Sequence, residues 1–408
     1  MATDTNGVIS ITKDVSWIGI LDNDIVTFDI VMETRNGTTY NSYFIDAGKK
    51  AIIDTAKETF RDEYLSKVKK VVNPSGIDYI IVNHTEPDHS GSLKYLLDIA
   101  PHAIVYGSRQ AINYLNEMVG RPFNSCFVKD GDTLDLDGKT LKFISAPNLH
   151  WPDTIYTYLE EDKILFTCDS FGSHYCNELM FDDLVGDFSQ SFKYYFDVIL
   201  RPFSKYMLNA LDKIRPLKIN TICPGHGPIL RTRWKELLEK TSRYAEIYLA
   251  NATSDENNIL ITYVSAYGYT RQMAELIARG ISEVLSCNVN IVDIEHILPG
   301  DLEELIVKSN SILIGSPTIN QNTLLPVYKM FSLFNPLRDK GKKATAFGSY
   351  GWSGEAVKLI ENQLKALKLD VVCEGISSRF SPNNEKSEKL IEFGKNFARQ
   401  LLLKKKEE

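Results

Sequence analysis

The chain has 408 residues, of which 43% are hydrophobic, so it is long and apolar enough for two globular domains with separate cores. Its net charge of -7 argues against nucleic acid as the main partner. No apolar run could span a bilayer, the N-terminus lacks a signal sequence and the six cysteines form no C-x-x-C pair, so we expect a cytoplasmic protein with reduced thiols and no membrane partner.

The first chemically informative segment is an apolar run, residues 77–82, that is typical of a buried strand. Four potential metal ligands follow it: His84, Glu86, Asp88 and His89. Pro87 favours an extended conformation at Glu86 and disfavours a helix, so we expect an extended segment with alternate side chains on one side. A serine hydroxyl in the turn at residues 90–92 is expected to cap a helix over residues 93–99.

Three further candidate ligands each lie at a strand end or in a Gly/Pro turn: His150, Asp169 and His226. A single His or Asp would most simply be structural, but seven candidates in such positions indicate two metal ions that share one site. Of the other histidines, we expect His102 and His296 on the surface. His174 and Tyr175, which follow Asp169 closely, are candidate catalytic residues near the metals; plain packing is the alternative for His174.

The second half of the chain has a different pattern. A predicted helix that contains Trp234 and Ile247 ends in a polar stretch, and we place a linker at residues 251–258 between domains 1–250 and 259–408. The predicted strands cover residues 259–264, 289–293, 311–315, 344–348 and 369–373, and a helix is expected over residues 271–285. Such alternation predicts a doubly wound, five-stranded parallel sheet whose ligands bind beyond the carboxyl ends of the strands.

Three loops at these strand ends form the second candidate site. The first comprises Ser265, Ala266, Tyr267, Gly268, Tyr269 and Thr270, the second Ser316, Pro317, Thr318, Ile319 and Asn320, and the third Ser349, Tyr350, Gly351, Trp352, Ser353 and Gly354. The first loop offers amides, hydroxyls and a helix N-terminus to one phosphate, and it has no Lys to reach further phosphates. This favours flavin mononucleotide (FMN), with the other loops supplying amides and aromatic rings to the flavin. Taken singly, each loop could equally be an ordinary turn.

The ligand pattern resembles a known metal signature. The metallo-β-lactamase fold has H-x-H-x-D-H followed by a His, an Asp and a His in a Gly-His-Gly turn, and this chain departs from it only in having Glu86 as the middle ligand. That replacement, together with the sequence His150-Trp151-Pro152-Asp153, resembles the flavodiiron proteins.

The three loops resemble those of a flavodoxin domain, although Ser265 and Tyr267 stand where the common phosphate loop has Thr. The resemblance covers essentially the whole chain. It implies an α/β protein in which a metallo-β-lactamase-like αββα sandwich precedes a flavodoxin-like sheet, with FMN near the junction of its first and third strands.

The same resemblance implies two non-haem iron ions. His84, Glu86 and His150 would bind one iron, Asp88, His89 and His226 the other, and Asp169 would bridge them. In some family members a water replaces the residue that matches His89. A mixture of carboxylate and imidazole ligands suits iron or manganese, whereas a zinc pair in this fold is bound by a larger share of nitrogen ligands.

The resemblance further implies an oxidoreductase that reduces dioxygen to water, nitric oxide to nitrous oxide, or both. Electrons would come from an external rubredoxin, a reduced deazaflavin or another flavoprotein. Subunits of the family pair head to tail, so we expect a homodimer, or a dimer of dimers, with Trp352 near the junction of flavin and irons. Two alternatives remain open: a zinc-dependent lactamase-type hydrolase with a flavodoxin appendage, and a gas-binding redox sensor.

Overall fold

The computed structural model describes residues 7–28, 32–252 and 258–404. The chain folds as two units, Met1–Thr253 and Ser254–Glu408. Residues 253–257 of the predicted linker lie outside the described residues. Asn251 and Ala252 belong to the last helix of the first unit, and Asn258 begins the first strand of the second. In the described ranges, no helix is long and apolar enough to cross a membrane.

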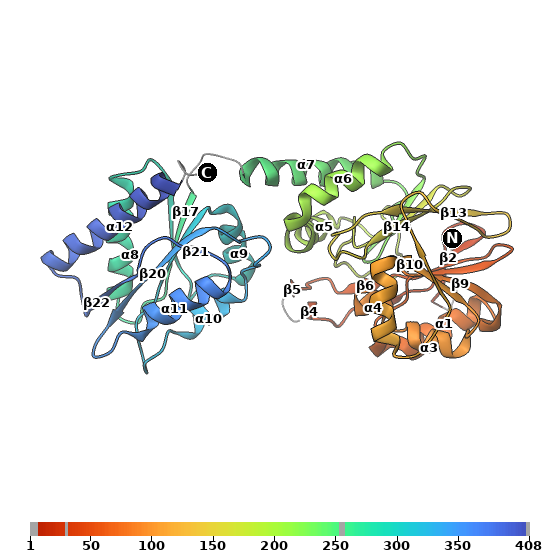
Figure 1. Cartoon of the computed structure of the whole chain (residues 1–408), viewed down its shortest axis with the longest axis horizontal. Coiled ribbons are helices and arrows are strands. Elements are labelled where there is room, and N and C mark those ends of the chain that lie inside the picture. The colour runs from red at the N-terminus through yellow and green to blue at the C-terminus, as the bar shows by residue number, and fades with distance from the viewer. Residues whose placement is uncertain (1–6, 29–31, 253–257, 405–408) are drawn as a thin grey trace. The chain divides into compact units, whose positions relative to one another are not determined.

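Two sheets form the centre of the N-terminal unit (Figure 1). Among the described residues, the first sheet consists of β1 (Ile9–Ser10), β2 (Val15–Trp17), β7 (Tyr43–Ile45), β8 (Lys50–Ile53), β9 (Ile77–Ile81), β10 (Ile104–Ser108) and β11 (Ser125–Val128), in that order. The second consists of β12 (Thr133–Asp135), β13 (Thr140–Ser145), β14 (Ile155–Leu159), β15 (Ile164–Cys168) and β16 (Thr221–Pro224). Two strand pairs stand apart: β3 (Ile20–Asp22) with β6 (Thr38–Tyr40), and β4 (Thr27–Phe28) with β5 (Met32–Glu33).

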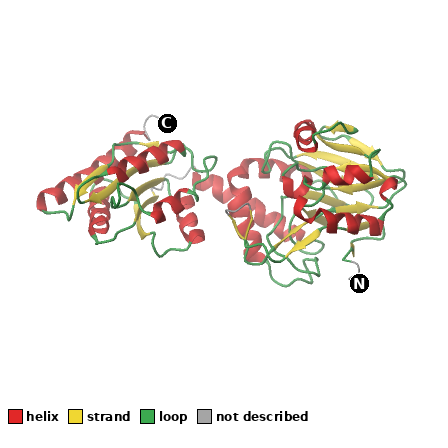
Figure 2. Ribbon diagram, turned by 90° about the horizontal axis from the view of Figure 1, so that it is seen from below, coloured by secondary structure: helices red, strands yellow, loops and turns green. Residues whose placement is uncertain are grey.

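Helices cover the outer face of each sheet, as Figures 1 and 2 show. The first sheet is covered by α1 (Arg61–Val71), α3 (Leu93–Ile99) and α4 (Arg109–Val119), and the second by α5 (Ser189–Tyr195), α6 (Ser204–Ile214) and α7 (Trp234–Ala252). Short helical turns lie at Glu58–Phe60, Pro74–Gly76, Phe196–Leu200 and Arg201–Phe203. The predicted αββα sandwich is therefore confirmed.

The strand before the first ligands is buried on both faces. In β9, Tyr79 and Ile81 pack into the apolar core between the sheets, while Ile77 and Ile80 pack against the helices. Each such isoleucine contributes about 1.5–3 kcal/mol by burial. This explains the apolar run in the sequence, which only the half-buried Asp78 interrupts, and gives the ligands a firm support.

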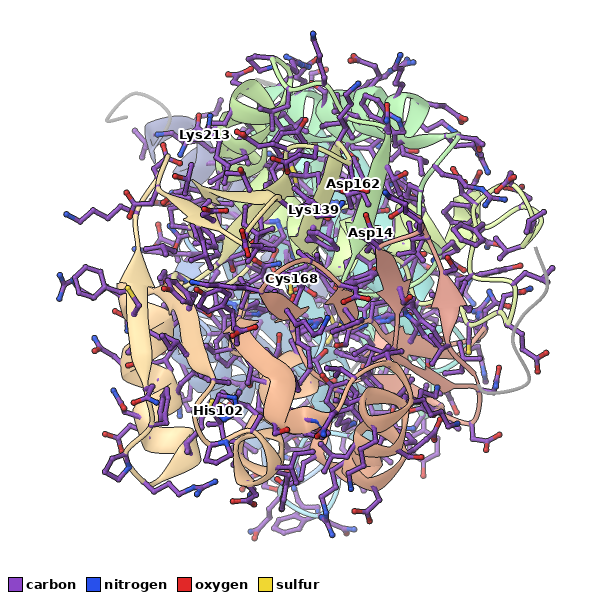
Figure 3. All side chains as sticks on the ribbon, turned by 90° about the vertical axis from the view of Figure 1, so that its right-hand side faces the viewer. Asp14, His102, Lys139, Asp162, Cys168 and Lys213 are labelled. Carbon is purple, nitrogen blue, oxygen red and sulfur yellow. The ribbon has the colours of Figure 1, made fainter. Side chains whose placement is uncertain are left out.

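One lysine forms ion pairs with two aspartates and so joins three turns of the N-terminal unit. Lys139 Nζ lies 3.0 Å from Asp14 and also pairs with Asp162 (Figure 3). Asp14 follows β1, Lys139 precedes β13 and Asp162 connects β14 to β15. The ion pairs thus tie the edge of the first sheet to hairpins of the second.

The segment after β9 corrects one prediction. A one-turn helix, α2 (Pro87–Ser90), begins directly after Glu86, whose ψ of 138° is extended. Proline is well suited to the first position of a helix because it has no N–H to leave unpaired there and its φ is preset. The expectation that Pro87 disfavours a helix here was therefore wrong, and Asp88 and His89 lie on α2, not on an extended chain.

The helix predicted at residues 93–99 is confirmed as α3, but no serine side chain caps it. Ser90 Oγ instead donates to the carbonyl of Thr85 at 2.7 Å, which closes the ligand loop.

The C-terminal unit has a parallel sheet of order β18-β17-β19-β20-β21, with β22 also paired to β20. Its strands are β17 (Asn258–Tyr263), β18 (Asn288–Asp293), β19 (Ser311–Gly315), β20 (Lys343–Tyr350), β21 (Asp370–Val371) and β22 (Ile376–Arg379). Its helices are α8 (Tyr269–Ser282), α9 (Pro299–Lys308), α10 (Leu325–Phe331), α11 (Glu355–Ala366) and α12 (Asn384–Lys404). The order places the first and third strands side by side, as a flavodoxin-like fold requires.

The fifth strand differs from the prediction. It is split into β21 and β22, both parallel to β20. The buried carboxylate of Glu361 on α11 accepts a hydrogen bond from Gly375 N at 2.5 Å, in the gap between the two pieces. In this gap, a side chain from outside the strand takes the place of a hydrogen-bond partner on the neighbouring strand. The periodicity of residues 369–373 does not reveal such a contact.

Candidate metal centre and cofactor loops

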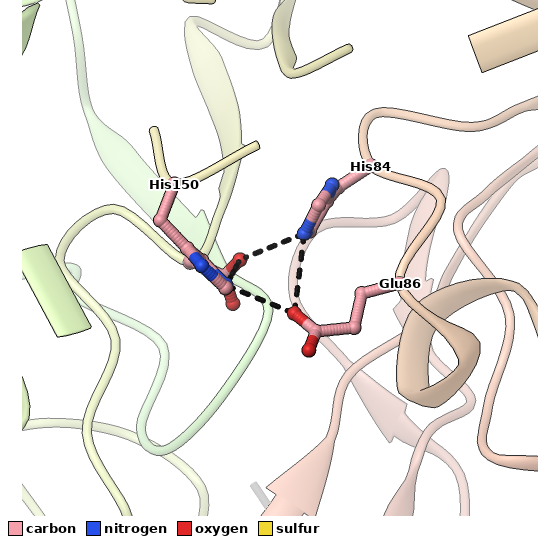
Figure 4. A group of neighbouring side chains, drawn as sticks. His84, Glu86 and His150 are labelled. Atoms are coloured by element: carbon pink, nitrogen blue, oxygen red, sulfur yellow. Dashed lines mark hydrogen bonds and ion pairs between the residues drawn. The ribbon is translucent and has the colours of Figure 1, made fainter. Parts of the chain in front are cut away.

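The structure brings the seven predicted metal ligands together in two groups at strand ends. In the first group, the Glu86 carboxylate contacts both histidines (Figure 4): its Oε2 is 3.3 Å from His84 Nε2 and 2.9 Å from His150 Nε2. His84 and Glu86 follow β9, while His150 lies between β13 and β14. Although these residues are far apart in sequence, the backbone N–H of Ile155 donates to the carbonyl of Asn83 at 2.9 Å and joins the two sheets at this point.

The second group consists of Asp88 and His89 on α2 and His226 after β16. Asp88 Oδ2 lies 3.3 Å from His89 Nε2 and 3.1 Å from His226 Nε2. Gly225 allows this approach, since a Cβ at that residue would lie 2.6 Å from His89 Cε1. All three ligand side chains are buried.

Asp169 faces both groups. Its Oδ2 lies 3.4 Å from His84 Nε2 and 3.5 Å from His150 Nε2, while its Oδ1 lies 3.1 Å from His89 Nε2 and 3.5 Å from His226 Nε2. One carboxylate oxygen per group is the arrangement of a bridging ligand between two metal ions.

The carboxylates create a strongly negative local potential. Burial lowers the pKa of His84, but its hydrogen bonds to Asp153 and Glu86 outweigh this and hold the pKa well above its ordinary value. Burial also lowers the pKa of His226, but hydrogen bonds and charge interactions with Asp169 and Asp88 outweigh this and raise the pKa to about 10. A potential that retains protons on buried imidazoles also attracts metal cations, which displace those protons on binding.

Buried carboxylate oxygens that lack hydrogen bonds indicate whether metal ions fit the site. Within the described part of the chain, Asp88 Oδ1 is buried and accepts no hydrogen bond, while the buried Oδ2 atoms of Asp88 and Asp169 contact imidazole nitrogens at 3.1–3.5 Å without hydrogen-bond geometry. An unpaired buried polar group costs about 1–3 kcal/mol, and more if it is charged. Cations bound by these oxygens and the surrounding imidazoles would remove that cost, and mixed oxygen and nitrogen donors suit iron.

Several supporting residues were missed by the sequence analysis. Asp153 Oδ2 accepts hydrogen bonds from His84 Nδ1 at 3.2 Å and from Thr85 N at 2.8 Å, which leaves His84 Nε2 facing the site. Asp153 ends the motif His150-Trp151-Pro152-Asp153, so its position three residues after a candidate ligand could have indicated a supporting role. Tyr195 Oη donates to Asp169 Oδ1 at 2.9 Å, but nothing in the local sequence of α5 indicates this.

The two candidate catalytic residues have different surroundings. His174 is buried beside the second group, with Nδ1 2.9 Å from Thr38 Oγ1, and burial together with neighbouring His226 lowers its pKa well below the ordinary value. Its ring packs against the ring of Tyr195, with 4.8 Å between the two ring centroids. Tyr175, in contrast, donates its hydroxyl to the carbonyl of Val185 and packs into the core against α5 to α7.

The other two histidines are exposed, as predicted. His102, labelled in Figure 3, precedes β10, and His296 belongs to the other unit.

The three flavin loops are joined at one edge of the C-terminal sheet. Thr270 Oγ1 in the first loop lies 2.9 Å from Ser349 Oγ in the third, and the carbonyl of Ser349 accepts a hydrogen bond from Thr318 N in the second at 2.8 Å. The first two loops follow β17 and β19, and the third begins with the last two residues of β20. This is the edge at which doubly wound sheets bind ligands.

The geometry of the loops fits a flavin phosphate and ring. The residue before α8 is Gly268 at φ 80°, which has no side chain to cap the helix. Arg271 N donates to Ser265 Oγ at 3.4 Å, so the other amides of this helix N-terminus are the ones that would bind an anion. Tyr267 and Trp352 are 79% and 75% exposed. Large exposed aromatic side chains on two adjoining loops are what a planar ligand would cover.

Comparisons with known proteins agree with both units. A family model described as ODP family beta lactamase matches residues 38–227, and one described as flavodoxin matches residues 261–394. The chain is 41% identical over 399 residues to a flavo-diiron protein of Clostridium acetobutylicum, with 96% of this chain and 99% of the relative covered. It is 33% identical over 401 residues to a nitric oxide reductase of Moorella thermoacetica, with 96% and 98% covered.

A solved structure gives the same result. The rubredoxin oxygen:oxidoreductase from the anaerobe Desulfovibrio gigas superimposes with a TM-score of 0.76 at 26% identity, and the match covers 97% of this chain and 99% of that one. Since relatives match both units over almost their whole length, the chain belongs to the flavodiiron protein family.

Proposed function

We propose that the protein is an oxidoreductase that reduces dioxygen to water, nitric oxide to nitrous oxide, or both, at a diiron centre supplied with electrons by FMN. The observation that carries this proposal is Asp169, which presents one carboxylate oxygen to each of two ligand groups. The same chain holds a flavodoxin unit. The names of its relatives, a nitric oxide reductase and a rubredoxin oxygen:oxidoreductase, support both substrates.

The proposed ligands follow the two groups. His84, Glu86 and His150 would hold one iron, Asp88, His89 and His226 the other, and Asp169 would bridge them. The short distance of 3.1 Å between His89 Nε2 and Asp169 supports direct ligation by His89 rather than a water in its place. When bound, a ferrous pair and reduced FMN together supply the four electrons that convert dioxygen to two waters, while coupling two nitric oxide molecules takes two.

The polypeptide would orient the ligands and exclude water. Asp153 directs His84 Nε2 to the site, and the carbonyl of Thr39 accepts a hydrogen bond from His226 Nδ1 at 2.6 Å. Tyr195 keeps its proton on Oη, because burial and the neighbouring Asp169 hold its pKa well above the ordinary value. His174 Nε2 is buried and has no hydrogen-bond partner in the described ranges, so this atom would be available to a substrate or water beside the second ligand group.

The decisive experiment is to purify the protein without oxygen, quantify iron, zinc and FMN per chain, and measure consumption of both gases with a chemically reduced donor. We expect two irons, one FMN and repeated turnover of at least one gas. Zinc with hydrolysis of thioesters or lactams would instead support a hydrolase. Oxidation that stops after one turnover would support a sensor.

The external donor and the assembly are part of the same proposal. We infer that a rubredoxin, a reduced deazaflavin or another flavoprotein reduces the FMN, and that two chains pair head to tail so that the flavin of one approaches the irons of the other. Support comes from the need for short electron-transfer distances and from the exposed Trp352 on the third loop. Sedimentation of a fully active monomer would contradict this arrangement.

A further inference from the structure

A strained and exposed aromatic residue lies beside the third flavin loop. Phe380, the residue after β22, has a φ of 57°, in the left-handed region, and its side chain is 53% exposed. The left-handed region is unfavourable for a bulky residue, and water contact is unfavourable for a phenyl ring. Strain of this kind persists where surrounding contacts impose it, and it clusters at ligand-binding segments.

Two hydrogen bonds attach this segment to the third loop. Phe380 N donates to the carbonyl of Tyr350 at 2.8 Å, and Arg379 Nε donates to the carbonyl of Gly351, also at 2.8 Å. The Arg379 guanidinium lies over the Phe380 ring, 5.6 Å from its centroid. These contacts fix two successive carbonyls directly before Trp352.

The segment is anchored on its other side. Ser381 Oγ donates to Gln272 Oε1 on α8 at 3.1 Å, and Lys386 Nζ donates to the carbonyl of Arg379 at 2.5 Å. Because α8 begins at the phosphate loop, residues 379–381 connect the first and third loops.

The fit to the third loop is close. A Cβ at Gly351 would lie 3.4 Å from Cε1 of Phe380, so the phenyl ring packs directly against the loop backbone. Trp352, the next residue, is 75% exposed. Two large aromatic side chains therefore lie next to one glycine, at the carboxyl ends of the adjacent strands β20 and β22.

We propose that Arg379 and Phe380 are positioning residues of the flavin site. Arg379 fixes the Gly351 carbonyl and thereby the turn that carries Trp352, while the Phe380 ring extends the aromatic wall beside the flavin. When FMN is bound, the Arg379 cation would also stabilise the one added negative charge that the flavin carries after taking up two electrons from the external donor and one proton. This inference rests on the proposed FMN site.

The guanidinium is tested with Arg379→Gln and Arg379→Lys, using Arg399→Ala as the control, because Arg399 is an exposed arginine paired only with Glu392 on α12 among its described contacts. FMN is titrated into the flavin-free full-length protein, and its dissociation constant and midpoint potential are measured. Arg379→Gln should weaken binding about tenfold, as expected when a charged hydrogen bond that orders the loop is lost, and should make the potential more negative. Arg379→Lys should restore the potential, and Arg399→Ala should change neither quantity.

The ring is tested by comparing Phe380→Ala with Phe380→Gly. Glycine removes the backbone strain along with the ring, whereas alanine keeps the strain. Weaker FMN binding in both variants supports the aromatic wall; wild-type affinity in Phe380→Gly would overturn it. Wild-type affinity and potential in Arg379→Gln would overturn the role of the guanidinium. If the unaltered protein bound no FMN, the proposed function itself would fail, which is a different result.

Discussion

Asp153 fixes the ligand orientation on which the first metal group depends. It is fully buried, and its Oδ2 accepts hydrogen bonds from His84 Nδ1 and from both the backbone and the hydroxyl of Thr85. A carboxylate in this position sets the tautomer of the imidazole and increases its basicity toward a metal.

We therefore expect Asp153→Asn to lower metal affinity by about 10–100-fold, the range for loss of such a partner. The affinity would be measured by competition with a chelator, with Asp212→Asn as the control. Asp212 is a surface residue with a side-chain exposure of 72%. Unchanged affinity in Asp153→Asn would mean that Thr85 and the protein packing suffice to orient His84.

Asp54 gives the metal-free protein a defined pH dependence. Burial raises its pKa from 3.8 to about 7, although nearby His89 and the hydrogen bond from Asn83 N act in the opposite direction. The folded pKa lies above the unfolded value, so the contribution of this carboxyl to stability is fully present below pH 3.8 and is lost as the pH rises to about 7.

Asp54→Asn removes this titration while retaining an acceptor for Asn83 N and a residue type that tolerates the φ of 54° at this position. In the metal-free state, the free energy of unfolding of the variant relative to wild type should rise between pH 4 and pH 7, by up to about 4 kcal/mol. Above pH 7 the difference should stay constant. Thermal unfolding of both proteins across pH would measure the difference. A constant difference would show that Asp54 titrates normally.

At the scale of elements, the centre depends on close approach of the turn after β16 to α2. Gly225 has room for no side chain, because its Cβ would meet His89 Cε1 at 2.6 Å and the carbonyl carbon of Cys168 at 3.1 Å. His89 and His226 belong to the second ligand group, whereas the first group is held by β9 and the loop before β14.

Gly225→Ala should therefore displace His89 and lower metal occupancy from two ions to one, at a cost of about 1–3 kcal/mol from overpacking. Metal analysis and unfolding midpoints would test this. Gly300→Ala is the matched control, since nothing lies within 4 Å of a Cβ there. Retention of two ions would mean that α2 can shift without losing its ligands.

At the scale of the whole molecule, each unit has its own cores. The N-terminal unit contains three apolar clusters and the C-terminal unit two further ones, in the described part of the chain. The candidate metal ligands all belong to the first unit and the candidate flavin loops to the second.

Removal of FMN should consequently leave the metal content and the unfolding of the N-terminal unit unchanged, while turnover with an external donor should fall to background. Metal analysis, calorimetry and gas consumption of the flavin-free protein would check this, with restoration by added FMN as the control. Loss of metal together with FMN would show that the two sites are coupled through the fold.

The sequence by itself determined which residues are candidate metal ligands, the alternating strands and helices of the second unit and the three candidate loops at their ends. These features are local: ligand chemistry belongs to a residue type, and strand or helix periodicity is a property of neighbouring residues. For this reason the predicted strand Ser311–Gly315 and helix Leu93–Ile99 match the structure to the residue.

Only the tertiary structure decided which distant residues support the site. His84 and Asp153 are 69 positions apart, and Tyr195 reaches Asp169 from a separate helix, so no local pattern records either contact. The split of the last strand into β21 and β22 likewise depends on a partner outside the segment, the Glu361 carboxylate. Packing between sheets and helices, which adds contacts over long sequence distances, overrides local preference at these positions.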